Sequence, residues 1–360
     1  SLPIILGGAH ASALPKHTLK RYAYKKNEII VVRGEAELVI SQILEGTDKN
    51  ELPGVYWLEN GEIKINKTLA KLATSYLDLN KAPLLDRNFF INEPSIDTNT
   101  GLKEGRILTT RGCPYACKFC AGAIDALGQP LRARSNSNII KEIKFIVQKH
   151  GIKSIRVVDD LFIRDEKQIN DFMDLLDEEK IDIKFDVTGR ANILYKFSND
   201  LWDRLSLRFN EISMGVEHGV KKIRHSAKKY IIDKHIFHTL DQGTKRNIKF
   251  KLYGIIGLPG TTYEDERQNI HYFKNTVEKY HGLVRASLFC YRPFPGTQYW
   301  HDLLAKGWTE KDMLQMSGDR PLKDKRSRKM VITSASFCEL AVEELSEMLI
   351  EFNKWQDDLF

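Results

Sequence analysis

Three cysteines stand close together in the sequence with the spacing CxxxCxxC. They are Cys113, Cys117 and Cys120. Thiolates this close in the chain can face one point and bind three irons of a four-iron cluster, because iron–sulfur clusters are held by soft thiolate ligands. Such a cluster usually has four thiolates. A loop that offers three therefore implies a site where a small molecule completes the coordination.

Two other uses of these cysteines are disfavoured. A disulfide with one odd thiol would be unusual, because the chain shows no secretory signal and cytosolic disulfides are rare. A zinc site would need a fourth ligand and usually has CxxC spacing. The iron–sulfur hypothesis therefore explains the spacing best. We expect the other two cysteines, Cys290 and Cys338, to be small buried hydrophobic residues.

The composition of the chain is that of an ordinary soluble protein. Of 360 residues, 42% are hydrophobic and 29% are charged. No apolar run is long enough to span a membrane, and Leu2–Leu6 is too short for a signal peptide. We expect a cytoplasmic protein. The net charge of +7 is mild, and we expect no nucleic-acid partner. The basic stretch Lys323–Lys329 is interpreted as a solvated loop, with a phosphate- or nucleic-acid-contacting patch as the alternative.

From about residue 107 to residue 291, short apolar runs alternate with helical patterns, which is typical of βα units around a parallel sheet. We predict strands over Ile107–Thr110, Ser154–Val158, Ile183–Val187, Glu211–Val216, Ile248–Ile256 and Leu283–Tyr291. We predict helices over Ile139–His150, Glu166–Leu176, a segment through Leu201 and Leu205, a long stretch to Arg246, and a segment from Thr261 to about Tyr280. Asn138 is the predicted cap of the first helix, Gly151 its predicted end, and Thr261 with Glu264 the predicted capping box of the last.

Six such units in about 185 residues are too few for a full eight-unit barrel, which typically needs about 250 residues. We therefore predict an open partial (β/α)6 barrel. In βα architectures the reactive groups gather at the carboxyl ends of the strands. The unusual motifs of this chain all follow predicted strands.

The ordered motifs resemble those of the radical S-adenosylmethionine (SAM) superfamily, in the branch with an N-terminal cobalamin-binding domain. The resemblance covers residues 1 to about 300 and rests on Gly7-Gly8-Ala9-His10, Arg33-Gly34-Glu35-Ala36-Glu37, Leu52-Pro53-Gly54-Val55, Asn60-Gly61-Glu62 and the cysteine loop. It implies the last part of a Rossmann-like cobalamin-binding domain over 1–55, a bridge over 56–104, the radical SAM core over 105–300 and a helical extension over 301–360. Within that extension, 337–353 is the predicted helix.

The resemblance also implies a SAM site. The open iron of the cluster would take the amino and carboxylate groups of SAM, and Phe119 matches the aromatic residue usual before the last cysteine. The residues implied to contact SAM are Phe119, Asp159, Asp160, Arg190, Glu217, Ile256 and Gly257. Three alternatives stay open: the two aspartates cap a turn, Arg190 and Glu217 form a structural ion pair, and His218 is a structural histidine. His218, Tyr291 and Arg292 are the residues implied to face the substrate.

For cobalamin, the resemblance implies contacts from Gly7, Gly8, Gly34 and Glu35, because glycine lets backbone approach a ligand closely. The family's lower-ligand motif, Asp-x-His-x-x-Gly, should lie upstream of the Gly-Gly turn and is not among these residues. Asp233-Lys234-His235 imitates only its start. Three alternatives stay open: preceding residues have been removed, another polypeptide supplies them, or cobalamin binding is vestigial.

The implied function is reductive cleavage of SAM at a 4Fe-4S cluster, giving a 5′-deoxyadenosyl radical that takes hydrogen from the substrate. The expected reaction is cobalamin-dependent methyl transfer to an unactivated carbon, with an external electron donor of the flavodoxin or ferredoxin type. Radical rearrangement or cyclisation of a natural-product or lipid substrate is the nearest alternative. A tRNA methylthio-transferase is disfavoured, because its extra cysteines and terminal basic β-barrel are not found. The non-enzyme alternative is a cluster- or cobalamin-binding subunit.

Overall fold

A computed structural model describes residues 3–22, 28–65, 76–89, 95–97, 100–127, 129–316, 320–321, 331–332 and 335–359. The basic stretch Lys323–Lys329 lies outside these residues. The chain forms two compact units. Unit 1 comprises Ser1–Pro83, Gly112–Leu131 and Phe294–Leu303, and unit 2 comprises Leu84–Arg111, Arg132–Pro293 and Leu304–Phe360.

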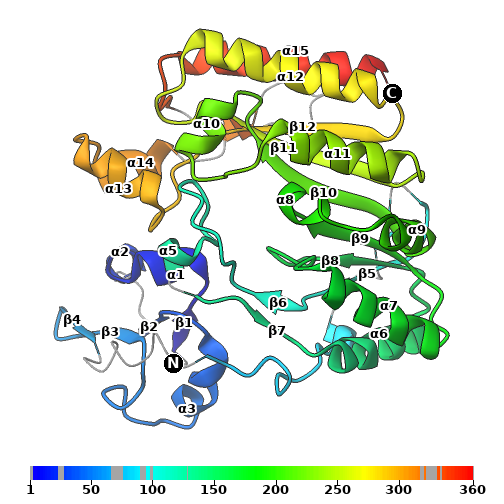
Figure 1. The fold of residues 1–360 in the computed structure, drawn as a ribbon. Helices are drawn as coiled ribbons and strands as arrows, with labels where there is room; N and C mark the ends of the chain where they lie inside the picture. Colours follow the sequence, from blue (N-terminus) through cyan, green and yellow to red (C-terminus); the bar gives the residue numbers. More distant parts are fainter. Residues whose placement is uncertain are drawn as a thin grey trace. The chain divides into compact units, whose positions relative to one another are not determined.

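Unit 2 is built on a six-stranded sheet (Figure 1). Each strand of this sheet pairs in parallel with the strand of the same sheet that follows it in the sequence. The strands are β5 (Glu104–Ile107), β8 (Ser154–Val157), β9 (Lys184–Gly189), β10 (Phe209–Glu217), β11 (Lys249–Ile256) and β12 (Val284–Cys290). Among the described residues β5 and β12 do not pair with each other. The sheet is therefore open, and the predicted partial barrel of six βα units is confirmed.

Helices connect the strands of unit 2. They are α6 (Asn136–His150), α7 (Glu166–Glu178), α8 (Ala191–Leu194), α9 (Asn199–Arg208), α10 (Lys221–Ser226), α11 (Asp233–Thr244) and α12 (Tyr263–Lys279). The buried side chains of these helices and of the strands form one continuous hydrophobic core. The helices are amphipathic, so burial of their apolar side chains against the sheet is the main force that places them.

The two faces of the six-stranded sheet differ in chemistry. Phe250 and Leu252 of β11 belong to the hydrophobic core, whereas Lys249, Lys251 and Tyr253 alternate with them and are half-buried. Successive side chains of a strand point to opposite faces, so this pattern defines an apolar face and a polar face. Neighbouring strands continue the polar face in register, with side chains of Arg156, Asp186, Ser213, Glu217, Arg285 and Phe289.

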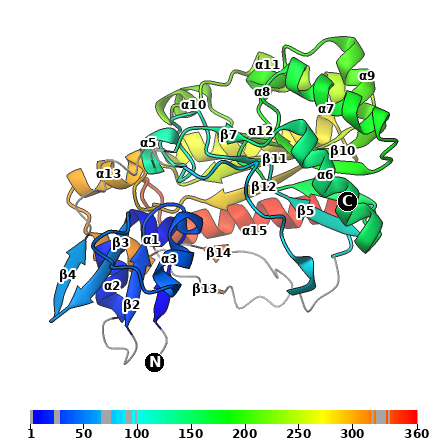
Figure 2. The ribbon, with the colours of Figure 1, turned by 90° about the horizontal axis from the view of Figure 1, so that it is seen from below.

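The last helix, α15 (Val342–Leu359), lies along the edge strand β12 (Figure 2). The Gln356 amide accepts a hydrogen bond from the backbone N–H of Ala286 at 2.8 Å and donates one to its carbonyl at 3.0 Å. One side chain thus satisfies both backbone groups that a further strand would satisfy. Exposed sheet edges promote unwanted pairing, and the helix covers this one.

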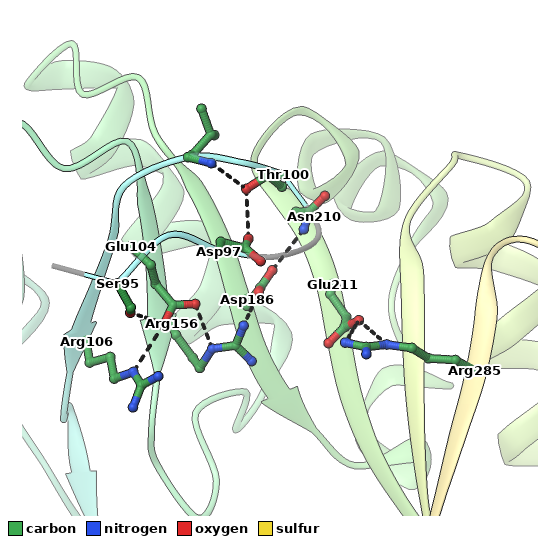
Figure 3. A network of polar contacts seen from close by, with 11 residues as sticks. Ser95, Asp97, Thr100, Glu104, Arg106, Arg156, Asp186, Asn210, Glu211 and Arg285 are labelled. Atoms are coloured by element: carbon green, nitrogen blue, oxygen red, sulfur yellow. Dashed lines mark hydrogen bonds and ion pairs between the residues drawn. The ribbon is translucent and has the colours of Figure 1, made fainter. Parts of the chain in front are cut away.

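Charged side chains at the amino ends of the strands pair with one another across the polar face (Figure 3). Arg156 donates to Glu104 at 2.8 Å and to Asp186 at 2.9 Å. Asn210 donates to the other Asp186 oxygen at 3.1 Å. Asp97 is also buried here and accepts a hydrogen bond from Thr100. Burial of Asp186 raises its pKa to about 6, although the bond from Asn210 and the charge of Arg156 oppose the rise.

Unit 1 contains a smaller sheet. Its order is β1 (Ile4–Leu6), β2 (Ile29–Val32), β3 (Val55–Glu59) and β4 (Glu62–Ile65), in which only the first pair is parallel. Helices α1 (Ala9–Ala13), α2 (Pro15–Tyr22) and α3 (Ile40–Leu44) accompany it. Asn60 and Gly61 have positive φ angles of 50° and 80°, as a tight hairpin turn requires. The expected domain boundary at residue 55 coincides with the first residue of β3.

The remaining described elements are short. They are η1 (Ala36–Leu38), η2 (Arg87–Phe89), β6 (Thr110–Arg111), α5 (Ile124–Leu127), β7 (Arg132–Ala133), α13 (Gln298–Ala305), α14 (Glu310–Met316), β13 (Arg320–Pro321) and β14 (Val331–Ile332). No helix in the described part of the chain has the length and apolar character needed to cross a membrane.

Several predicted elements need correction. The first core strand ends at Ile107, where it was predicted to begin. The long helix predicted to reach Arg246 is two helices, α10 and α11, because Lys228 and Tyr230 adopt left-handed backbone conformations between them. Two helices start at caps that were not predicted: Ser135 caps α6, and Thr262 with Asp265 forms the capping box of α12. The C-terminal helix predicted from residue 337 begins at Val342.

Candidate cofactor site

The cysteine loop belongs to unit 1 and follows β6. All five cysteines of the chain are thiols rather than disulfides. Within the loop Cys117 is buried, while Cys113 and Cys120 are half-buried. The N–H of Cys120 donates to the carbonyl of Cys117 at 3.1 Å, which closes a turn between the last two cysteines. Three thiols on one short, folded loop would supply three of the four ligands that a 4Fe-4S cluster usually has.

Two further contacts hold this loop in shape. Gly112 has a φ of 82°, and a Cβ atom there would lie 2.4 Å from the Pro130 carbonyl oxygen, so only glycine fits. The Tyr299 N–H donates to the Lys118 carbonyl at 3.0 Å, and the Lys118 ammonium lies 5.7 Å from the centre of the Tyr299 ring. Phe119 is half-buried beside them. Tyr299 is a loop-positioning residue that the sequence analysis did not identify.

At the end of β8, the two aspartates have different environments. Asp159 is buried and accepts hydrogen bonds from both the backbone N–H and the hydroxyl of Thr109, the former at 2.6 Å. Burial raises the pKa of this carboxyl, against the effect of those hydrogen bonds. Asp160 is exposed. Asp159 thus tethers the segment that follows β5, a structural use other than the predicted turn cap, and Asp160 is the more exposed of the two.

Arg190 and Glu217, at the ends of β9 and β10, both contact Lys229. The Lys229 ammonium lies 2.7 Å from a Glu217 carboxylate oxygen, and its backbone carbonyl accepts a hydrogen bond from the Arg190 guanidinium. Arg190 also donates to Asn192 at 2.8 Å. All three residues of this cluster are buried. These contacts favour a cluster around Lys229 over the predicted direct ion pair between Arg190 and Glu217.

Lys229 was missed because nothing in its local sequence marks it. It stands in the turn between α10 and α11, flanked by Lys228 and Tyr230 with φ values of 55° and 50°. Glu217 itself has a φ of 71°, which is uncommon for a non-glycine residue. A Cβ atom on Gly215 would lie 2.1 Å from the Glu217 carboxylate, so glycine at 215 is what leaves room for this carboxylate.

Two fully buried polar side chains of α12 hold the turns after β10 and β11. Glu266 accepts a hydrogen bond from the Gly257 N–H at 2.9 Å. Asn269 accepts one from the Gly219 N–H at 2.7 Å and donates to the Ile255 carbonyl at 3.0 Å. His218 is also fully buried, with its Nε2 atom 3.6 Å from Glu266, and its Nδ1 atom accepts from the Val220 N–H. These contacts favour the structural alternative for His218 over the predicted substrate role.

The other predicted residues of this region lie near the same turns. Ile256 is fully buried, and its carbonyl accepts a hydrogen bond from the Tyr291 N–H at 2.8 Å. Tyr291 is buried against the ring of Phe337, whose centre lies 5.8 Å away. Arg292 is half-buried. The expectation that Tyr291 lies open to the substrate does not fit its burial among the described residues.

In unit 1, the glycines expected to approach cobalamin follow the two parallel strands. Gly7 and Gly8 follow β1, and Gly34 follows β2. Gly8 and Gly34 have φ angles of 92° and 89°, and no atom lies within 4 Å of where their Cβ atoms would be. This open backbone fits a site that a ligand approaches closely. Glu35 accepts a hydrogen bond from the Leu77 N–H at 3.0 Å, which gives it a structural use.

Part of the chain matches a known protein family. Residues 107–272 match the radical SAM superfamily. In fold the chain is similar to OxsB, a cobalamin-dependent SAM radical enzyme, with a TM-score of 0.63 and 17% identity over 84% of this chain and 48% of that one. It is also similar to TsrM, a radical SAM methyltransferase from Kitasatospora setae, with a TM-score of 0.61 and 16% identity over 84% of this chain and 58% of that one.

Curated relatives agree with this class. An uncharacterized methyltransferase of Pyrococcus horikoshii is 24% identical over 84% of this chain, and cytidylyl-2-hydroxyethylphosphonate methyltransferase of Streptomyces wedmorensis is 21% identical over 85%. The chain spans 63% and 61% of the length of these two relatives. The match of residues 107–272 agrees with the resemblance to the radical SAM superfamily predicted from the cysteine loop.

Proposed function

We propose that this protein is a radical SAM enzyme that transfers a methyl group to an unactivated carbon in a cobalamin-dependent reaction. The observation that carries the proposal is a three-thiol loop in a chain whose parallel sheet matches the radical SAM type. The names of the relatives support methyl transfer, and two fold neighbours named for cobalamin support that cofactor. A cluster bound at the loop would supply the electron that cleaves SAM.

Different residues of this chain would bind the cluster, SAM, cobalamin and the substrate. Cys113, Cys117 and Cys120 would hold the cluster. Asp160, Arg190 and Glu217 would supply the polar contacts for SAM, a zwitterionic nucleoside, and Phe119, Asp159, Ile256 and Gly257 would shape its site. Gly7, Gly8, Gly34 and Glu35 would line the backbone approach to cobalamin, and Arg292 the approach of the substrate. The electron would come from a flavodoxin- or ferredoxin-type donor.

Anaerobic reconstitution tests the cluster and its reaction. The protein as expressed should bind iron and sulfide and convert SAM with a reductant to 5′-deoxyadenosine. Cys117→Ser should lose iron and this product together. Cys290→Ser is the matched control, because Cys290 is equally buried but lies in β12 outside the loop, and it should keep both. Retention of iron and SAM cleavage in Cys117→Ser would overturn the proposal.

Cobalamin content tests the proposed dependence of methyl transfer on cobalamin. Purified protein supplemented with hydroxocobalamin should show a bound cobalamin absorption band that Gly34→Val weakens, since the valine side chain would occupy the open backbone approach. SAM labelled in its methyl group should then label the substrate. SAM cleavage without bound cobalamin or methyl transfer would instead support rearrangement or cyclisation, and partner binding without SAM cleavage would support the non-enzyme alternative.

A further inference from the structure

The polar face of the six-stranded sheet carries an excess of positive charge on one side. Lys249 and Lys251 of β11 and Arg285 of β12 lie on this face, in register with their neighbours. Arg285 donates to one Glu211 oxygen from two nitrogens, at 2.7 and 2.9 Å. Neither lysine forms an ion pair within the described residues. Among the described residues in this part of the face, one carboxylate, that of Glu211, therefore lies near three cations.

The lysines are half-buried rather than surface groups. A half-buried ammonium loses part of its hydration, and this loss is usually offset by a paired anion. On the β5–β9 side of the same face, Arg156 has such partners in Glu104 and Asp186. Among the described residues, the contact of the Lys251 ammonium is with the ring of Tyr253, whose centre lies 5.1 Å away. Within the described part of the chain, this side of the face therefore carries positive charge that a ligand anion would neutralise.

An aromatic pair stands next to this charge toward the carboxyl ends. The rings of Tyr253 and Phe289 lie 6.0 Å apart on the neighbouring strands β11 and β12. Phe289 is 54% exposed, which is unusual for a phenylalanine in a sheet. The cation of Lys251 and the rings of Tyr253 and Phe289 therefore follow one another along the polar face, toward the carboxyl ends of the strands.

We propose that this patch, formed by Lys251, Arg285, Tyr253 and Phe289, binds the oxyanion-bearing end of the substrate. The proposal rests on the proposed function in placing the reaction at the carboxyl ends of the strands. Lys251 contacts the phosphate or carboxylate, and the adjoining apolar part lies on the two rings. Lys251 precedes Ile255, near the end of β11, by four residues, which is roughly 13 Å of strand. The substrate is therefore an elongated molecule whose charged end lies toward the amino ends of the strands.

Equilibrium binding of small probes to the full chain tests the patch. Phenyl phosphate should bind saturably at low salt, more tightly than inorganic phosphate, which lacks the ring, or benzyl alcohol, which lacks the charge. Phenylacetate distinguishes a carboxylate site from a phosphate site, since the better of the two anions identifies the group. Added salt should weaken the binding of either anion.

Variants assign the binding to these residues. Lys251→Met should weaken phenyl phosphate about tenfold, the effect of losing one charge-assisted contact, and Phe289→Ala should remove most of its advantage over inorganic phosphate. Lys274→Met is the matched control, because Lys274 of α12 is also half-buried and lies 5.4 Å from an aromatic ring, that of Trp355. Thermal unfolding should show that all three variants are folded.

Equal affinity of Lys251→Met and Lys274→Met for phenyl phosphate would overturn the proposal, as would binding of benzyl alcohol as tight as that of phenyl phosphate. SAM cleavage measured on the same samples keeps this inference separate from the proposed function. Failure of probe binding with intact SAM cleavage overturns the oxyanion site alone. Probe binding that depends on Lys251 in a protein that cannot cleave SAM overturns the proposed function alone.

Discussion

The two ends of the six-stranded sheet use their polar residues differently. At the amino ends, charged side chains pair with each other across the polar face, as Arg156 does with Glu104 and Asp186 (Figure 3). At the carboxyl ends there is also a buried pair, Lys229–Glu217, but Glu266 and Asn269 bind backbone instead, at the end of β11 and in the turns after β10 and β11. Side-chain pairs fix strands, whereas side-chain-to-backbone bonds fix the shape of loops. The first arrangement is suited to stability and the second to holding a site.

The comparison predicts that amino-end substitutions change stability alone. Arg156→Met leaves Glu104 and Asp186 buried without their shared cation, so the free energy of unfolding should fall by about 2–3 kcal/mol; a third of Arg156 is exposed, which keeps the loss below that of a fully buried pair. Urea unfolding measures the loss, and SAM cleavage per folded molecule should be unchanged.

Arg106→Met is the control for this change. Arg106 also pairs with Glu104, at 3.1 Å, but its side chain is 62% exposed. Exposed pairs contribute little, and the variant should unfold within about 0.5 kcal/mol of the parent. A similar cost for both variants would show that the amino-end network does not depend on Arg156, and would weaken the contrast between the two ends.

Removing Asn269 should affect both stability and activity. Asn269→Ala leaves the half-buried N–H of Gly219 without its acceptor and the Ile255 carbonyl without its donor, which should lower the free energy of unfolding by about 1–3 kcal/mol. Because the same side chain joins the turns after β10 and β11, SAM cleavage should also fall by roughly tenfold to a hundredfold, the range for residues that support a site from outside it. Asn275→Ala, at an exposed position of the same helix, should change neither quantity. Loss of stability with full SAM cleavage would contradict the assignment of these turns to the site.

The amino-end network should also give the protein a pH dependence. The pKa of Asp186 is about 6 in the folded protein and 3.8 in a free side chain. The folded state therefore binds this proton more tightly, and its contribution to stability is lost as the pH rises from about 4 through 6. Asp186→Asn cannot titrate, so its free energy of unfolding relative to the parent should rise by about 1–2 kcal/mol between pH 4.5 and pH 7. Urea titrations at several pH values measure this, and Asp182→Asn, with a side chain 96% exposed, should show no such trend.

Strands with one apolar face, such as β11, could be predicted from the sequence. The strand that lacks this pattern, β5, was predicted at the wrong residues. In β11, apolar and polar residues alternate over the whole strand, and its predicted span is almost the observed one. In β5 the residues Glu104, Gly105 and Arg106 come before one apolar residue, Ile107. The charges of β5 belong to the amino-end network, whose partners come from distant strands. The local pattern therefore could not show that Glu104 is buried.

The sequence could identify those residues of the candidate site that belong to one continuous motif. The cysteine loop is one continuous motif, so its thiols could be named at once. Lys229 could not be found, because it meets Glu217 and Arg190 only through a turn with left-handed residues. Glu266 and Asn269 did leave a signal: they are polar residues at buried, i and i+3 positions of an amphipathic helix. Polar groups in such positions need partners, and that rule would have marked them.

Substitutions at two glycines, one at each end of the sheet, should have the smallest effects in this comparison of the amino and carboxyl ends. Gly151 ends α6 at the amino end of the sheet with a φ of 63°, and no atom lies within 4 Å of its missing Cβ. Gly257 follows β11 with a φ of 74°, and its Cβ would lie 2.9 Å from Leu345. Gly151→Ala should therefore cost only backbone strain, about 1 kcal/mol, and leave SAM cleavage unchanged. Gly257→Ala adds a steric clash in a turn held by Glu266, so it should cost more and slow SAM cleavage. Equal effects of the two substitutions on both measurements would mean that the carboxyl-end turns are no more closely tied to the reaction than an ordinary helix end.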